Sequence, residues 1–266
     1  MSYIIPRRAI FRLIAVVIIT TIACGSPPSQ ETTHPSTPLP TQPADVPRVV
    51  FLGDSLSAGK GLAEADAFPA VAEELLGESG VVIDAVNAGV SGDTSAGGLA
   101  RLDWVLGQQV DVLVVELGGN DALRGQSLEN TEANLRQIVR RGREAGARVL
   151  LLGMDIPTNY GPAYATAFAE MYVRVADEEG VTLVPGFVRQ VGIDPGLMQP
   201  DGLHPNAAGH RRLAESLVPY LTDVLAHVSG YGEVLSPEGR QIPNLGRQPD
   251  THAPYLRRTC YQLTGL

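Results

Sequence analysis

RVVFLGDSLSAGKGL, residues 48–62, joins an apolar run to a small and polar turn. Val49 to Leu52 have the β-branched and aromatic character of a buried strand. Ser55 follows just beyond the carboxyl end of this strand, the edge at which open α/β sheets keep their chemistry. Backbone N–H groups in such a turn can stabilise negative charge beside the serine hydroxyl. Ser55 is therefore a candidate nucleophile.

Two other interpretations of this stretch compete with a nucleophile. A serine in such a place most often caps a helix or turn, and on these residues alone that interpretation is favoured. A phosphate-binding loop is the second, because Gly59-Lys60 follows the strand. That loop requires a glycine five positions before its Gly-Lys and a Ser or Thr after it, whereas Asp54 and Gly61 stand there. The phosphate loop is excluded, and the rest of the chain must decide between cap and nucleophile.

Composition limits the class of protein. The chain has 266 residues, of which 44% are hydrophobic, so it can bury one domain-sized core. Its formal net charge is −9, and it has no basic stripe, which argues against nucleic acid as a partner. The two cysteines, Cys24 and Cys260, allow at most one disulfide and have no metal-ligand spacing. A disulfide scaffold and a zinc site are therefore not supported.

Residues 1–24 are predicted to be an export signal. Three arginines precede an apolar stretch, 13–22, that ends at Ala23-Cys24. This end resembles the bacterial lipoprotein signal, whose cysteine becomes the lipid-modified first residue of the mature protein. Thr21 departs from the leucine usually found three positions before that cysteine, so plain cleavage or an uncleaved anchor stays open. We expect an exported protein, anchored by lipid to a bacterial cell envelope at the periplasm or cell surface.

The segments that flank the predicted domain have different compositions. Residues 25–47 are rich in Pro, Ser and Thr with almost no large apolar side chain, which predicts an unfolded, extended tether. Residues 229–266 contain Gly, Pro and Arg without periodicity and include Cys260. They are interpreted as an irregular C-terminal extension.

Between these segments, residues 48–228 alternate strand-like and helix-like patterns. Near-continuous apolar strands separated by helices predict a parallel sheet covered on both faces, a three-layer α/β/α sandwich. The predicted strands are 49–52, 81–86, 110–117, 148–154 and 182–184, and the predicted helices are 68–78, 95–106, 128–145, 163–179 and 207–228.

Useful polar groups follow several of the predicted strands. After the second strand, residues 87–94 form a flexible turn that can offer backbone N–H groups. After the third comes Gly118-Gly119-Asn120-Asp121, in which the Asn120 amide can donate to an oxyanion. Near the end of the domain, Asp201 and His204 are three positions apart, so the carboxylate can bond one ring nitrogen and fix the tautomer. These loops are expected on one edge of the sheet, with Ser55.

These residues and their order resemble the SGNH hydrolases, also called the GDSL family, over about residues 48–225. The most similar branch contains thioesterase I, lysophospholipase L1 and arylesterases. The resemblance implies a five-stranded parallel sheet in the flavodoxin-like order 2-1-3-4-5 and no metal or organic cofactor. It also implies a nucleophile, Ser55, an acid and base, Asp201 and His204, and an oxyanion hole made by the backbone N–H groups of Ser55 and Gly92 with the Asn120 side chain.

Less specific roles compete at several of these positions. His204 could be a loop histidine that merely precedes a helix capped by Asn206. Asn120 could be only a turn former. Asp54 and Asp121 stand next to strand ends, where hydrogen bonds that brace the loops are favoured over a catalytic role.

We therefore expect an exported serine esterase that hydrolyses esters or thioesters, of the aryl or acyl ester, lysophospholipid or acyl-thioester type. One alternative is a carbohydrate O-deacetylase of the same family. The sequences NAGVSGDTSAGGLAR, 87–101, and ELGGND, 116–121, look more like the lipid and aryl esterase branch. A second alternative is an inactive, lipid-anchored binding protein.

Overall fold

The computed structural model describes residues 46–228. The predicted export signal 1–24 with Cys24, the tether up to residue 45, and the extension 229–266 with Cys260 lie outside the described residues. None of the helices between residues 46 and 228 is long and apolar enough to cross a membrane.

The described strands form one parallel sheet in the order β2-β1-β3-β4-β5, as the family resemblance implied. Because β2 and β3 pair with opposite edges of β1, the connections leave β1 in opposite directions, and a crevice is expected at its carboxyl end. The strands are β1 (Arg48–Gly53), β2 (Asp84–Gly89), β3 (Val112–Glu116), β4 (Arg148–Leu152) and β5 (Thr182–Val184).

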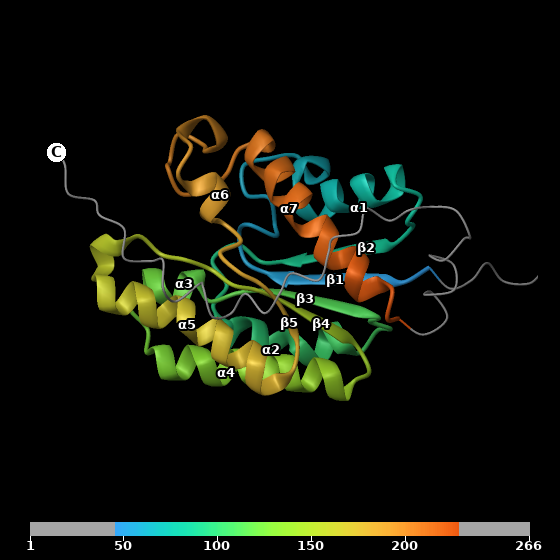
Figure 1. Cartoon of the computed structure of the whole chain (residues 1–266), viewed down its shortest axis with the longest axis horizontal. Coiled ribbons are helices and arrows are strands. Elements are labelled where there is room, and N and C mark those ends of the chain that lie inside the picture. The colour runs from blue at the N-terminus through green and yellow to red at the C-terminus, as the bar shows by residue number, and fades with distance from the viewer. Residues whose placement is uncertain (1–45, 229–266) are drawn as a thin grey trace, which may run out of the picture. The chain divides into compact units, whose positions relative to one another are not determined.

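Helices cover both faces of the sheet (Figure 1). Val49 and Phe51 pack with α1 (Phe68–Glu78) and α7 (Ala207–Leu225) on one face. Val50 and Leu52 point to the other face, which is covered by α2 (Ser95–Leu106), α4 (Leu128–Glu144) and α5 (Pro162–Glu179). Because side chains alternate between the two faces along each strand, the sheet contributes to two cores, one on each face.

Several short helical segments complete the described chain. They stand in the connections, and two of them, α3 and α6, approach the carboxyl edge of the sheet, where the chemistry is expected. The segments are α3 (Gly119–Leu123), α6 (Arg189–Gly192) and the 3-10 turns η1 (Glu64–Asp66), η2 (Thr158–Tyr160) and η3 (Pro195–Leu197).

The predicted bounds of the second strand are wrong, since the strand is Asp84–Gly89 and not 81–86. Val81 and Ile83 are buried, but they belong to the connection from α1, where the N–H of Val81 donates to the carbonyl of Leu76 over 2.9 Å. As an edge strand, β2 is only partly buried along its length, so it does not require the apolar side chains that the prediction followed. The last helix ends at Leu225 rather than at 228.

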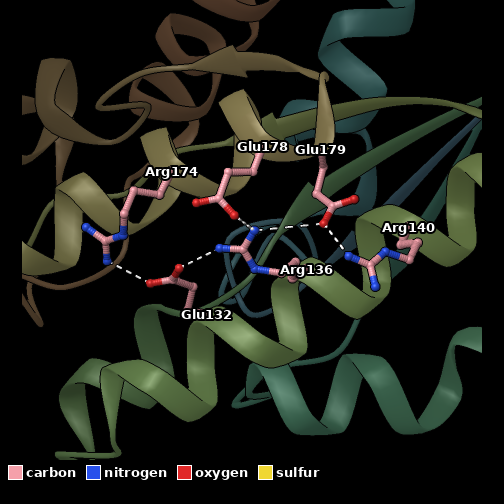
Figure 2. A network of polar contacts seen from close by, with 6 residues as sticks. All are labelled: Glu132, Arg136, Arg140, Arg174, Glu178 and Glu179. Atoms are coloured by element: carbon pink, nitrogen blue, oxygen red, sulfur yellow. Dashed lines mark hydrogen bonds and ion pairs between the residues drawn. The ribbon is translucent and has the colours of Figure 1, made fainter.

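Helices α4 and α5 are linked by a network of charged side chains (Figure 2). Arg136 bonds Glu132, one helical turn away, and Glu178 across the interface. The Glu179 carboxylate is only 7% exposed and accepts from Arg140 over 2.7 Å. Because the Glu179 carboxylate is largely buried, losing its arginine partner would cost more than losing the partner of the exposed Glu178. The network comprises Glu132, Arg136, Arg140, Arg174, Glu178 and Glu179.

Candidate active site

Ser55 lies in a tight turn that leaves the carboxyl end of β1. The carbonyl of Asp54 accepts from the N–H of Ala58, and the carbonyl of Ser55 accepts from the N–H of Lys60, each over 3.0 Å. The turn packs closely on the end of β1, because a side chain at Gly53 would come within 1.9 Å of the Ser57 hydroxyl. A glycine is required there. The N–H of Ser55 has no acceptor among the described residues.

His204 connects Ser55 to Asp201. Its Nε2 lies 3.0 Å from the Ser55 Oγ, and its Nδ1 lies 2.7 Å from the Asp201 Oδ2. When Nδ1–H donates to the carboxylate, Nε2 presents a lone pair to the hydroxyl. His204 itself is buried, with 5% of its surface exposed. The sequence-predicted nucleophile, base and acid therefore stand in one hydrogen-bonded chain.

The loop that precedes α7 fixes the orientation of Asp201. Its Oδ1 accepts from the N–H groups of Leu203, over 2.9 Å, and His204, over 3.0 Å. The hydrogen bonds from the His204 backbone and ring and from the Leu203 backbone hold the pKa of the Asp201 carboxyl well below its ordinary value. Asp201 therefore stays ionised and keeps accepting from the imidazole. As predicted, Asn206 caps α7, its side chain accepting from the N–H of Gly209.

Asn120 and Gly92 meet Ser55 at the same cavity. Asn120 stands in α3 and donates one amide hydrogen to the Asp54 Oδ2 over 2.8 Å, which leaves its second hydrogen for a ligand. Gly92 has a φ of +84°, and its carbonyl accepts from the Arg124 guanidinium over 2.8 Å. In the described part of the chain the N–H of Gly92, like that of Ser55, has no acceptor. Three donors are thus available at one cavity.

The cavity at this edge has a volume of about 540 Å³. Besides the polar groups above, it is lined by apolar side chains that include Leu56, Met154, Ile156 and Ile193. Such a combination of an apolar wall and a few convergent polar groups is typical of a site for a small molecule.

The two other acids near the strand ends brace loops, as favoured from the sequence. Asp54 is 3% exposed, and its Oδ1 accepts from the N–H of Leu56 over 3.0 Å. Asp121 is also buried and accepts from the backbone N–H and hydroxyl of Ser95 and from the hydroxyl of Thr131. Asp121 thereby ties the start of α2 to α4, and Asp54 orients the Asn120 amide.

A second buried histidine, His210, has a structural role. Its Nδ1 accepts from the N–H of Phe68 over 3.1 Å, which caps the start of α1, and its ring stacks on that of Phe68. Burial and the nearby His204 lower the pKa of His210 to about 4, so it is neutral and able to accept at neutral pH. It does not line the cavity.

One buried polar residue at the site was not assigned a role from the sequence. Glu116, the last residue of β3, has no exposed surface and accepts hydrogen bonds from the turn that carries Ser55. An acid at the end of an otherwise wholly apolar strand, VLVVE, is the signal that could have singled it out. Across residues 46–228, no group of three His, Cys, Asp or Glu side chains is placed to hold a metal ion.

The chain is similar to proteins of known family. Residues 51–212 match the family described as GDSL-like Lipase/Acylhydrolase family. The Esterase TesA of Pseudomonas aeruginosa is 45% identical over 186 residues, which are 70% of this chain and 92% of that protein. The Thioesterase 1/protease 1/lysophospholipase L1 of Escherichia coli K12 is 41% identical over 182 residues, 68% of this chain and 86% of that protein. A crystal structure of TesA superposes with a TM-score of 0.65 at 44% identity, covering 67% of this chain and 99% of the other.

Proposed function

Because the chain belongs to the GDSL-like lipase/acylhydrolase family and is a carboxylic ester hydrolase, we propose that it forms an acyl-enzyme on Ser55. The contacts from Ser55 through His204 to Asp201, 3.0 and 2.7 Å long, support this proposal most directly. A nucleophile next to a base that is itself oriented by a third group is the arrangement that activates a serine.

Acylation follows from these contacts. The Nε2 of His204 takes the Ser55 proton as Oγ attacks the carbonyl carbon, and the Asp201 carboxylate stabilises the imidazolium that forms. The negative charge that develops on the carbonyl oxygen is received by the N–H groups of Ser55 and Gly92 and by the Asn120 amide. The tetrahedral intermediate collapses as His204 returns the proton to the leaving alcohol or thiol.

Deacylation repeats the same steps with water. His204 removes a proton from the water that attacks the acyl-enzyme, and the same three donors receive the charge of the second oxyanion. The proton then goes to the Ser55 Oγ as the carboxylic acid is released. These steps require only side chains and backbone groups of this chain and water.

We propose that the substrates are esters or thioesters with an apolar acyl or aryl group. The apolar part of the cavity wall supports this, since Leu123, Ile193 and Leu203 line it and are themselves 40%, 81% and 52% exposed. The relatives are named for ester, thioester and lysophospholipid substrates. Hydrolysis rates are measured over p-nitrophenyl esters and acyl-thioesters of increasing chain length. The rates for the longer acyl chains are expected to exceed the rate for the acetate.

A carbohydrate O-deacetylase is the alternative within the family. It would prefer sugar acetates over longer acyl chains, so a panel of sugar acetates run beside the profile separates the two substrates. The absence of turnover on both panels would contradict an ester hydrolase.

Replacing Asn120 by alanine is expected to lower kcat by about 10²- to 10³-fold, or about 3–4 kcal/mol, with little change in KM. The substitution removes one of three oxyanion donors while the contact between Ser55 and His204 stays intact. The ground state barely uses that donor, so binding changes little. The measurement needs an ester whose chemistry is rate-limiting, and a near-normal kcat would remove Asn120 from the oxyanion hole.

We also propose that the protein is exported and held at a membrane through a lipid on Cys24, which lies outside the described residues. Cys24→Ala is then expected to release active enzyme from the membrane fraction, because the residues that form the site all belong to the described domain. A single acyl chain binds a membrane only marginally, so firm retention calls for several chains. Unchanged retention of the Cys24→Ala variant would instead favour the apolar segment 9–22 as an uncleaved anchor.

A further inference from the structure

Glu116 is the buried acid directly beneath the turn that carries Ser55. It is paired with Gly53 across the β1–β3 ladder and has no exposed surface. Its Oε2 accepts from the N–H of Asp54 over 3.1 Å, from the N–H of Ser57 over 3.1 Å and from the hydroxyl of Ser57 over 2.8 Å. One carboxyl oxygen thus collects three donors of this turn.

These donors flank the nucleophile, one position before it and two positions after it. The N–H groups of residues 54 and 57 point inward to Glu116, while the intervening N–H of Ser55 has no acceptor in the described chain and remains available at the cavity. We propose that Glu116 is a positioning residue, which fixes this turn so that the Ser55 hydroxyl meets His204 and the Ser55 N–H faces the oxyanion. The proposal rests on the proposed function of Ser55 as nucleophile.

The other oxygen of Glu116 indicates the state in which the residue acts. Oε1 is buried and has no hydrogen-bond partner among the described residues. Burial raises the pKa of Glu116 well above its ordinary value, and the nearby Asp54 carboxylate raises it further, although the hydrogen bonds at Oε2 favour the charged form. An ionised carboxylate with one bare oxygen in this place would be costly, so burial favours the neutral acid at Glu116.

A neutral Glu116 carboxyl suits the proposed reaction at Ser55. A neutral carboxyl still accepts hydrogen bonds at Oε2, but it does not place a negative charge of its own beneath the turn where the oxyanion develops. A purely structural role is the alternative, in which the same bonds stabilise the fold and do not affect the rate. The two roles differ in what they predict for the rate of each correctly folded molecule.

The test compares Glu116→Gln with Glu116→Met. Glutamine keeps an acceptor oxygen and is neutral, whereas methionine has similar length and no comparable acceptor. We expect Glu116→Gln to keep kcat within about 3-fold. We expect Glu116→Met to lower kcat by about 10²-fold with KM nearly unchanged, the loss typical of a small misplacement of reacting groups. Rates are referred to the concentration of folded enzyme, measured by circular dichroism, and labelling of Ser55 by a fluorophosphonate should slow by the same factor.

Two further variants serve as controls. Glu179→Met removes another largely buried acid, far from the cavity in α5, and is expected to lower the midpoint of urea unfolding while kcat stays unchanged. Ser57→Ala removes the shortest of the three bonds to Oε2 and leaves Glu116 in place. It is expected to lower kcat by about 3- to 10-fold, and it tests the same role if Glu116→Met does not fold.

The outcomes separate the inference from the proposed function. A folded Glu116→Met with a kcat within 2-fold of the wild type, or an unaffected Ser57→Ala if the methionine variant does not fold, would overturn the positioning role. Equal losses of kcat in Glu116→Gln and Glu116→Met would overturn the inference that Glu116 acts as a neutral acid. A wild-type protein that hydrolyses none of the esters would contradict the proposed function instead, and the labelling rate of Ser55 would still decide whether Glu116 positions it.

Discussion

Alanine in place of Ser55 is expected to lower kcat/KM for a p-nitrophenyl ester by at least about 10⁴-fold and to abolish labelling by a fluorophosphonate. Without Oγ no acyl-enzyme can form, and water attacking directly has neither its position nor its activation by His204. The only described partner of Oγ is the His204 ring, and the turn is held by backbone groups and Glu116. The fold should therefore remain.

Urea unfolding of the Ser55→Ala variant checks this, with an expected midpoint close to that of the wild type. Ser79→Ala is the matched control, because Ser79 is an exposed serine at the end of α1 whose hydroxyl bonds only a helix carbonyl. It should be labelled and hydrolyse esters like the wild type. Probe labelling that persists in Ser55→Ala would place the nucleophile elsewhere.

Replacing Asp201 by asparagine is expected to lower kcat by about 10⁴-fold at neutral pH. The amide can present a donor to Nδ1 of His204, which then favours the tautomer with its proton on Nε2 and cannot accept from Ser55. The low pKa of Asp201 means that the wild type keeps this carboxylate ionised well below neutral pH, so protonation of Asp201 does not limit the wild-type rate there.

A pH–rate profile distinguishes this loss from a loss of oxyanion stabilisation. In Asp201→Asn, part of the rate is expected to return at alkaline pH, where hydroxide can replace the missing base. In Asn120→Ala no such recovery is expected, because the base is undamaged. A loss in Asp201→Asn of less than about 10-fold would mean that another group orients His204.

The central strands could be predicted because their burial on both faces requires runs of apolar residues, which can be recognised in the sequence. All residues of VLVVE in β3 are buried, and such a run between helical patterns has few alternatives. The edge strand β2 has no such apolar run, since the side chains of DAVNAG are small, partly polar and only partly buried. Its bounds are set by pairing with β1, from Arg48 opposite Asp84 to Gly53 opposite Gly89, which is a non-local constraint.

The same distinction holds for the site. Ser55, Asn120 and His204 could be proposed because each stands in a short motif next to a strand end or helix start. Glu116 could not be given a role, because its hydrogen-bond partners Asp54 and Ser57 are 62 and 59 residues earlier in the chain. Only pairing of β1 with β3 brings this acid beneath the turn.

The role of Ser55 as nucleophile is tested by treating the wild-type protein with a fluorophosphonate and identifying the modified residue by mass spectrometry of its peptides. We expect one phosphonylated site, Ser55, with the adduct forming in step with the loss of esterase activity. An adduct on a different residue, or complete inactivation without modification of Ser55, would contradict that role.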